Sequence, residues 1–160
     1  MPIMVERPKW ILYKHTNNFT KIKLFAWSVK YNCATRIDET NRHWLSEDWF
    51  QKGLYSPRNK GKLDAINHRI NTLEYFMFGY EHREQGHTRF MFSPLGNLFL
   101  KHIEDDEHLP KIFTAMLFAI QFQHPANNTP ACFQLFPFRL IFSLLLEREL
   151  DYKLYFDEYV

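Results

Sequence analysis

The feature that most constrains the fold is a regular spacing of apolar residues near the middle of the chain. Leu63, Ile66, Ile70, Leu73 and Met77 follow one another at intervals of three and four residues. This spacing predicts one face of an amphipathic helix over residues 62–78, with Gly79 at its end. The polar side chains of the segment fall on the opposite face or at its border: Asn67, His68, Arg69, Asn71 and Thr72.

A β-hairpin is predicted directly after this helix, over residues 80–93. Gly86 lies in the polar stretch that forms the turn, and residues 88–92 are the expected return strand, although Met91 interrupts the strict alternation. Ser93 and Pro94 then form a typical helix start. Helix, hairpin and further helix in this order are typical of winged-helix domains. The sequence therefore predicts a mainly α chain with small β-hairpins (α+β), winged-helix-like over about residues 40–105.

The remaining elements are expected on both sides of this region. Residues 10–13 resemble a short strand, residues 21–27 fit a strand or a short helix, and a short helix is expected from Ser46 with Gly53 after its end. A helix over about residues 110–123 is apolar nearly all round and is expected to be buried. A further helix is expected from Pro137 to Glu149. We expect residues 1–160 to form a single domain, with a helical part from about 106 to 160.

Charge is distributed unevenly along the chain. Residues 1–62 contain twelve Lys and Arg against five Asp and Glu, whereas residues 103–160 contain four against nine. This asymmetry indicates a surface for an anionic partner in the first part. Neither a signal peptide nor an apolar run of about 18 residues is visible, so we expect a cytoplasmic chain without membrane contact. Cys33 and Cys132 are expected to be small core residues.

DNA is the partner that the polar residues favour. Asn can pair with adenine and Arg with guanine in the major groove, whereas Lys and Arg neutralise phosphates. The predicted helix, its basic entry and the hairpin offer these groups, although a plain solvated helix and hairpin would contain the same residues. The candidate DNA-binding residues are Arg58, Asn59, Lys60, Lys62, Asn67, His68, Arg69, Asn71, Arg83, Gln85, His87 and Arg89.

No complete catalytic centre is found in the sequence. The five glycines form no phosphate-binding loop. Residues 104–107 are acidic, and we interpret them as a solvated loop that favours the start of the next helix rather than as a metal site. Asp151 and Lys153 match half of a metal-dependent nuclease motif, so a small complete nuclease stays an alternative. A protein-interaction subunit that uses the apolar segment from Tyr152 to Tyr159 is another.

Three motifs in a fixed order resemble a known family. They are Ser93-Pro94-Leu95-Gly96-Asn97, the stretch at residues 119–125, and Phe136-Pro137-Phe138-Arg139. This order, together with an early Trp10-Ile11-Leu12, resembles the N-terminal DNA-recognition domain of AlwI-type type IIS restriction and nicking endonucleases. The resemblance covers most of residues 10–150. Within these motifs we expect Pro94 and Pro137 to start helices and Gly96 to allow close helix packing.

The resemblance implies a winged-helix recognition region that reads a short asymmetric site in duplex DNA, as part of restriction–modification. It also implies a separate C-terminal nuclease domain of the PD-(D/E)xK type, which uses magnesium and cuts at a distance. This chain stops at Val160, before such a nuclease domain would begin, so we expect that domain to be absent from it. We therefore expect no catalytic residue, metal site or cofactor in this chain, and duplex DNA and a nuclease domain or subunit as partners. The parent protein would be a type II site-specific deoxyribonuclease.

Overall fold

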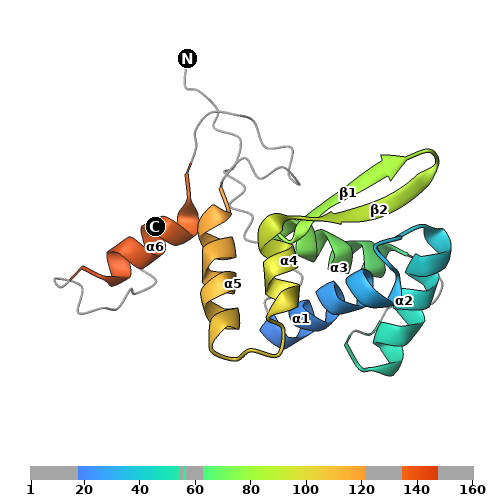
Figure 1. Ribbon diagram of the computed structural model, residues 1–160, viewed down its shortest axis with the longest axis horizontal. Coiled ribbons are helices and arrows are strands. Elements are labelled where there is room, and N and C mark those ends of the chain that lie inside the picture. Colours follow the sequence, from blue (N-terminus) through green and yellow to red (C-terminus); the bar gives the residue numbers. More distant parts are fainter. Residues whose placement is uncertain (1–17, 55, 57–62, 122–134, 148–160) are drawn as a thin grey trace, which may run out of the picture.

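A computed structural model of the chain describes residues 18–54, 56, 63–121 and 135–147. Within these ranges the chain is mainly helical and has one two-stranded antiparallel sheet, which confirms the α+β class (Figure 1). The elements are α1 (Phe19–Trp27), the π-helix η1 (Ser28–Asn32), α2 (Glu39–Gln51), α3 (Asp64–Tyr75), β1 (Gly79–Glu84), β2 (His87–Phe92), α4 (Pro94–Lys101), α5 (His108–Ala119) and α6 (Pro137–Leu145).

The first two long helices begin at polar side chains that cap them. The Asn18 side chain accepts a hydrogen bond from the Lys21 N–H at 3.0 Å, and Asp38 caps α2 in the same way. Residues 21–27 are therefore helical, and the strand alternative for them is wrong. The helix expected from Ser46 begins earlier, at Glu39, because the Asp38 side chain already accepts a hydrogen bond from the Asn41 N–H in the first turn.

The central helix α3 buries the predicted apolar face but is shorter than expected. Ile66, Ile70 and Leu73 are fully buried. The helix ends at Tyr75, and Met77 lies beyond it with a positive φ of 64°. Gly79 does not end the helix, as the spacing had predicted, but lies in β1. A Cβ atom there would be 2.0 Å from the Met91 carbonyl oxygen, so the close approach of the two strands requires glycine.

The hairpin forms where the sequence predicts it. Gln85 and Gly86 both have positive φ, at 48° and 83°, which is typical of a tight two-residue hairpin turn. Phe90 is buried and Met91 is exposed, so Met91 does not interrupt the alternation of β2. The stretch before α2 also lies beside β2, because the Ile37 N–H donates to the Thr88 carbonyl at 2.9 Å.

The start of α4 confirms the expected roles of Ser93, Pro94 and Gly96. The Ser93 hydroxyl accepts from the Gly96 N–H at 2.9 Å and donates to the Met77 carbonyl at 2.7 Å. A Cβ on Gly96 would be 2.2 Å from the Phe78 carbonyl oxygen. Glycine therefore lets α4 lie directly against the chain that enters the hairpin.

Aromatic rings connect the helices into one core. Phe99 of α4 packs edge-on against Phe78 and Phe19, with ring centroids 4.8 and 5.9 Å apart. Phe113 of α5 lies 4.9 Å from Phe19. The core thus joins α1, α4, α5 and the chain that leads into β1. Cys33 is also buried, as expected.

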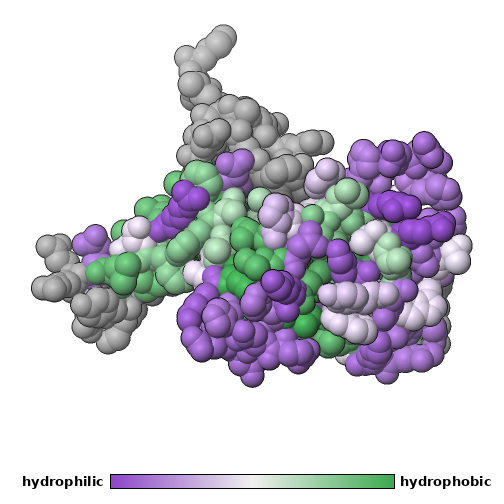
Figure 2. Space-filling view, in the orientation of Figure 1, coloured by the Kyte–Doolittle hydropathy of each residue, from purple (hydrophilic) through white to green (hydrophobic). Residues whose placement is uncertain are grey.

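The last two described helices differ most from the sequence-based expectations. In α5 only Leu109 and Met116 are buried, whereas Ala115 is exposed. The expected burial all round is wrong: α5 lies between α4 and α6 (Figure 1), and residues of α5 such as Lys111 and Ala115 stay exposed. Helix α6 contacts α5 and ends four residues before the predicted Glu149. Hydrophobic residues gather over α5 and α6 (Figure 2).

Among the described helices, none has the length and apolar content needed to cross a membrane. The strand expected at residues 10–13 lies outside the described residues, as does Cys132.

Candidate nucleic-acid interface

Helix α3 presents most of the predicted polar face on the side opposite its buried residues. The placement of Thr72 with that face is wrong: Thr72 is fully buried, and its hydroxyl donates to the His68 carbonyl at 2.9 Å. His68 is exposed, and Asn67 and Asn71 are half-buried. Asn71 lies four positions after Asn67 and three after His68, so it is a neighbour of both on the helix surface. Arg69 lies at the border and is also half-buried.

A polar cleft lies between α2, α3 and β1. Its volume is about 460 Å³. Helix α3 contributes two amides and a carboxylate to it, α2 contributes a guanidinium and β1 contributes a second carboxylate. The lining residues are Arg42, Leu63, Asn67, Asn71, Glu74 and Glu81.

Arg42 connects the three elements around this cleft. Its Nε donates to the Ile37 carbonyl and its Nη2 to the Glu81 carboxylate, each at 2.7 Å. Its Nη1 donates to the Asn67 Oδ1. Arg42 was not among the predicted site residues. The Arg42 side chain thereby orients the Asn67 amide. The Asn67 oxygen already accepts a hydrogen bond from Arg42, so the NH₂ group of Asn67 is the part left to donate to a ligand.

The two carboxylates of the cleft are engaged by the protein itself. Glu74 Oε1 accepts the backbone N–H of Glu81 at 2.6 Å. Burial raises the pKa of Glu74 above its ordinary value, and the neighbouring Glu81 raises it further, while the hydrogen bond and Arg42 act in the opposite direction. Asn71 makes no hydrogen bond among the described residues, so its whole amide is available to a ligand.

The predicted hairpin residues are exposed but lie on two faces of the sheet. Residues that pair directly across the strands share a face. His82 pairs with Arg89 and Glu84 with His87, on the face opposite the buried Phe90. Arg83 therefore lies on the same face as Glu81, toward α3, and Gln85 is in the turn. The hairpin tip belongs to a strongly hydrophilic part of the surface (Figure 2).

The structure adds a further cation, Arg36, beside Arg89, on the face of the hairpin opposite the buried Phe90. Arg36 pairs with Arg89 in an isolated antiparallel bridge, so the two guanidinium groups start from adjacent backbone positions. Arg36 also forms an ion pair with Asp38, with 2.7 Å between Nη2 and Oδ2. A backbone hydrogen bond from Asn41, and then this Arg36 contact, lower the pKa of Asp38. No spacing in the sequence relates Arg36 to Arg89.

Part of the predicted site lies outside the described residues. This holds for the basic entry to α3 with Arg58, Asn59, Lys60 and Lys62, whose contacts with phosphate stay a prediction. It also holds for Asp151 and Lys153 and for the segment from Tyr152 to Tyr159. The structure therefore places Arg83 on the face of the hairpin that is directed toward α3, and His87 and Arg89 on the opposite face. The basic entry to α3 lies outside the described residues, so its role stays a prediction.

Comparison with known proteins gives two matches. The family model described as "Type II restriction endonuclease HgaI, N-terminal domain" matches residues 5–160. The type II restriction enzyme HgaI of Avibacterium volantium is 43% identical over 152 residues, which are 93% of this chain and 31% of that protein. This chain thus spans less than a third of the length of that curated relative. No solved structure matches it significantly.

Proposed function

The chain belongs to the family of N-terminal domains of the type II restriction endonuclease HgaI, and on this premise we propose that it binds duplex DNA and reads its sequence. A restriction enzyme acts on DNA, so one of its domains must recognise the site. The observation that carries the proposal is the open amide face of α3 beside a hairpin with exposed cations.

The order of the elements supports a winged-helix arrangement for this domain. Helices α1, α2 and α3 precede the hairpin, and the short extended stretch between η1 and α2 pairs with β2 as a third strand would. In this arrangement α3 is the recognition helix that enters the major groove. The hairpin is the wing, and its tip projects away from α4 and α5 (Figure 1).

Different residues carry different parts of the recognition. The free amide of Asn71 can donate to and accept from one base edge, which suits adenine. The Asn67 NH₂ group, oriented by Arg42, offers donors only and therefore reads an acceptor on a base. Arg83 on one face of the wing and Arg89 with Arg36 on the other contact phosphates, as does the basic entry with Lys60 and Lys62. Phosphate contacts position the protein but read no sequence.

The position of the match suggests the organisation of a longer enzyme. The chain corresponds to the N-terminal part of a protein more than three times as long. We place site reading in this part, and magnesium-dependent cleavage in a separate nuclease domain of the remaining chain. This is the type IIS arrangement, in which cleavage occurs at a distance from the recognised site, and the resemblance to AlwI-type enzymes agrees with it.

Selection from a pool of random DNA duplexes tests the proposal. The purified chain should enrich one short site, and Asn71→Ala should relax the preference at a single base pair, with a loss of about 1–3 kcal/mol in discrimination. Gln51→Ala is the matched control, because Gln51 carries an exposed amide on α2 that bonds only to Glu47 of the same helix among the described contacts. Enrichment of no sequence, or equal effects of both variants, would contradict this reading of α3.

A further inference from the structure

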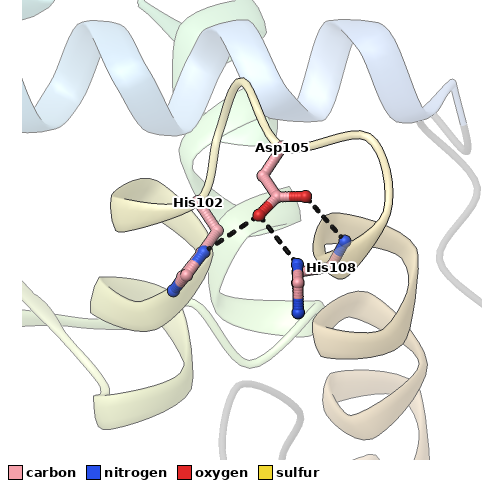
Figure 3. Close-up of side chains that lie close together, drawn as sticks. All are labelled: His102, Asp105 and His108. Atoms are coloured by element: carbon pink, nitrogen blue, oxygen red, sulfur yellow. Dashed lines mark hydrogen bonds and ion pairs between the residues drawn. The ribbon is translucent and has the colours of Figure 1, made fainter.

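A cluster of potential metal ligands lies in the turn between α4 and α5. His102 follows the last residue of α4, His108 is the first residue of α5, and Asp105 lies midway between them. Both imidazoles direct their Nδ1 atoms at the same carboxylate oxygen, Asp105 Oδ2, at 3.5 and 2.8 Å (Figure 3). The three donor atoms all lie within 4.8 Å of one another.

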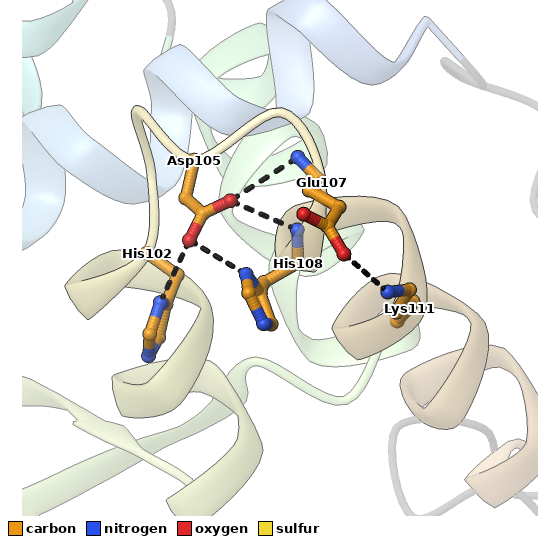
Figure 4. A network of polar contacts seen from close by, with 5 residues as sticks. All are labelled: His102, Asp105, Glu107, His108 and Lys111. Atoms are coloured by element: carbon orange, nitrogen blue, oxygen red, sulfur yellow. Dashed lines mark hydrogen bonds and ion pairs between the residues drawn. The ribbon is translucent and has the colours of Figure 1, made fainter.

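The backbone holds the central carboxylate in place. Asp105 Oδ1 accepts the N–H groups of Glu107 and His108 at 3.1 and 3.0 Å (Figure 4). The second oxygen, Oδ2, is thereby turned toward the two histidines. The three side chains are still partly exposed, at 31%, 36% and 56%, so an ion can reach them from solvent.

We propose that His102, Asp105 and His108 bind one divalent transition-metal ion, with Zn²⁺ as the best fit, through the two Nδ1 atoms and Oδ2. Zn²⁺ binds imidazole nitrogen and carboxylate oxygen at about 2.0–2.2 Å in tetrahedral geometry, which places two ligand atoms about 3.4 Å apart. The two distances to Oδ2 lie on either side of this value. The ligand atoms of the cluster all lie within 4.8 Å of one another, so rotation of the partly exposed histidine side chains can bring their nitrogens to a common ion while the backbone stays in place.

The types of ligand atom in this site favour a different ion from the magnesium that a nuclease domain would use. Imidazole suits Zn²⁺, Cu²⁺ and Ni²⁺, whereas Mg²⁺ prefers oxygen ligands. Three protein ligands leave a fourth position for water. The site also lies on the turn between α4 and α5, on different elements from the candidate DNA interface (Figure 1). Metal binding therefore does not depend on the proposed function.

The charge around the cluster favours a cation. Glu104, Asp106 and Glu107 flank Asp105 in the same turn. Glu107 forms an ion pair with Lys111 at 3.0 Å, whereas the contact of Glu104 with Lys23 is longer, at 3.9 Å. Two of the four carboxylates of the turn, including that of Asp105, thus have no lysine or arginine partner among the described residues. An ion held here joins the end of α4 to the start of α5 and stabilises the folded chain.

Calorimetric titration of the 160-residue chain, without a histidine tag, with ZnCl₂ tests the proposal. We expect one ion per chain, and at least tenfold weaker binding in His102→Asn and in His108→Asn. His43→Asn is the matched control, because His43 is also an exposed histidine, near Glu39 on the same helix, but has no second histidine in its cluster. Co²⁺ should give the intense visible absorption of a tetrahedral site in the wild type and in His43→Asn only.

A purely structural cluster would give other results. Failure of the wild-type chain to bind Zn²⁺, or equal affinity in the wild type and both ligand variants, overturns the proposal. Asp105→Asn covers the case in which a histidine variant fails to fold, because an Asn side-chain oxygen can still accept the two backbone N–H groups. This variant should keep its circular dichroism spectrum and bind Zn²⁺ more weakly. Unchanged affinity in it would also overturn the proposal.

Discussion

Replacing Arg42 with Met removes the guanidinium that connects α2, α3 and the hairpin. The Arg42 side chain is only 13% exposed, and that of its partner Glu81 is 28% exposed. The change leaves the Glu81 carboxylate without its cation, and the Asn67 and Ile37 oxygens without their donor. Loss of one partner from a buried ion pair costs about 3–5 kcal/mol. Because Glu81 keeps some contact with water, we expect a loss of about 3 kcal/mol.

Unfolding in guanidinium chloride measures this loss, together with Glu81→Gln and the double variant. The double variant should be more stable than the sum of the single losses predicts, by about 1–2 kcal/mol, since it leaves no unpaired carboxylate. The matched control is Lys111→Met. Lys111 and Glu107 form a similarly short ion pair of 3.0 Å, but their side chains are 67% and 75% exposed. Exposed pairs contribute about 0–1 kcal/mol.

Two results would refute the reasoning about Arg42. One is an equal loss of stability in Arg42→Met and Lys111→Met, which would mean that burial adds nothing to this ion pair. The other is strict additivity of the Arg42 and Glu81 changes, which would mean that the two groups do not interact.

Three further predictions concern single side chains. Gly96→Ala should lower the free energy of unfolding by about 2–3 kcal/mol, because its Cβ would be 2.2 Å from the Phe78 carbonyl; an unchanged denaturation midpoint would contradict this close contact. Burial raises the pKa of Glu74, so its ionisation destabilises the fold as pH rises through that pKa. Glu74→Gln should therefore be more stable than the wild type at pH 8 and equally stable below about pH 4, and a pH-independent difference would be the contrary result. Burial also raises the pKa of Cys33 to about 11, so in a Cys132→Ser background its reaction with a disulfide reagent at pH 8 should be slow until the chain is unfolded, and equal rates would disprove it.

The central elements could be predicted because their signals are local. The spacing of Ile66, Ile70 and Leu73 marks one helix face, and Ser93 with Pro94 marks a helix start, without knowledge of the rest of the fold. The resemblance found in the sequence also gave the right broad family, the type II restriction enzymes. Its finer parts, the AlwI type and the recognition role, stay proposals.

The missed features depend on contacts that spacing does not reveal. Arg42 contacts Glu81 across 39 positions, and Arg36 pairs with Arg89 across an even longer stretch. The end of α3 was misplaced because Met77 adopts a positive φ that a side chain rarely takes, whereas Gly79 has a different role. The His102–Asp105–His108 cluster combines the residue after α4, a residue in the middle of the turn and the first residue of α5. These residues belong to no single helix, so no helical period in the sequence indicates that they converge.

Binding of the chain to duplex DNA as a function of salt tests the central claim most directly. Fluorescence anisotropy should give an affinity that falls steeply between 50 and 200 mM salt, since each neutralised phosphate contributes about −0.9 to the slope of log affinity against log salt. Arg83→Ala should weaken binding to all sequences alike and reduce this slope by about one unit, whereas Lys52→Ala should leave it unchanged. A chain that gives no salt-sensitive binding to a random-site pool would contradict the account.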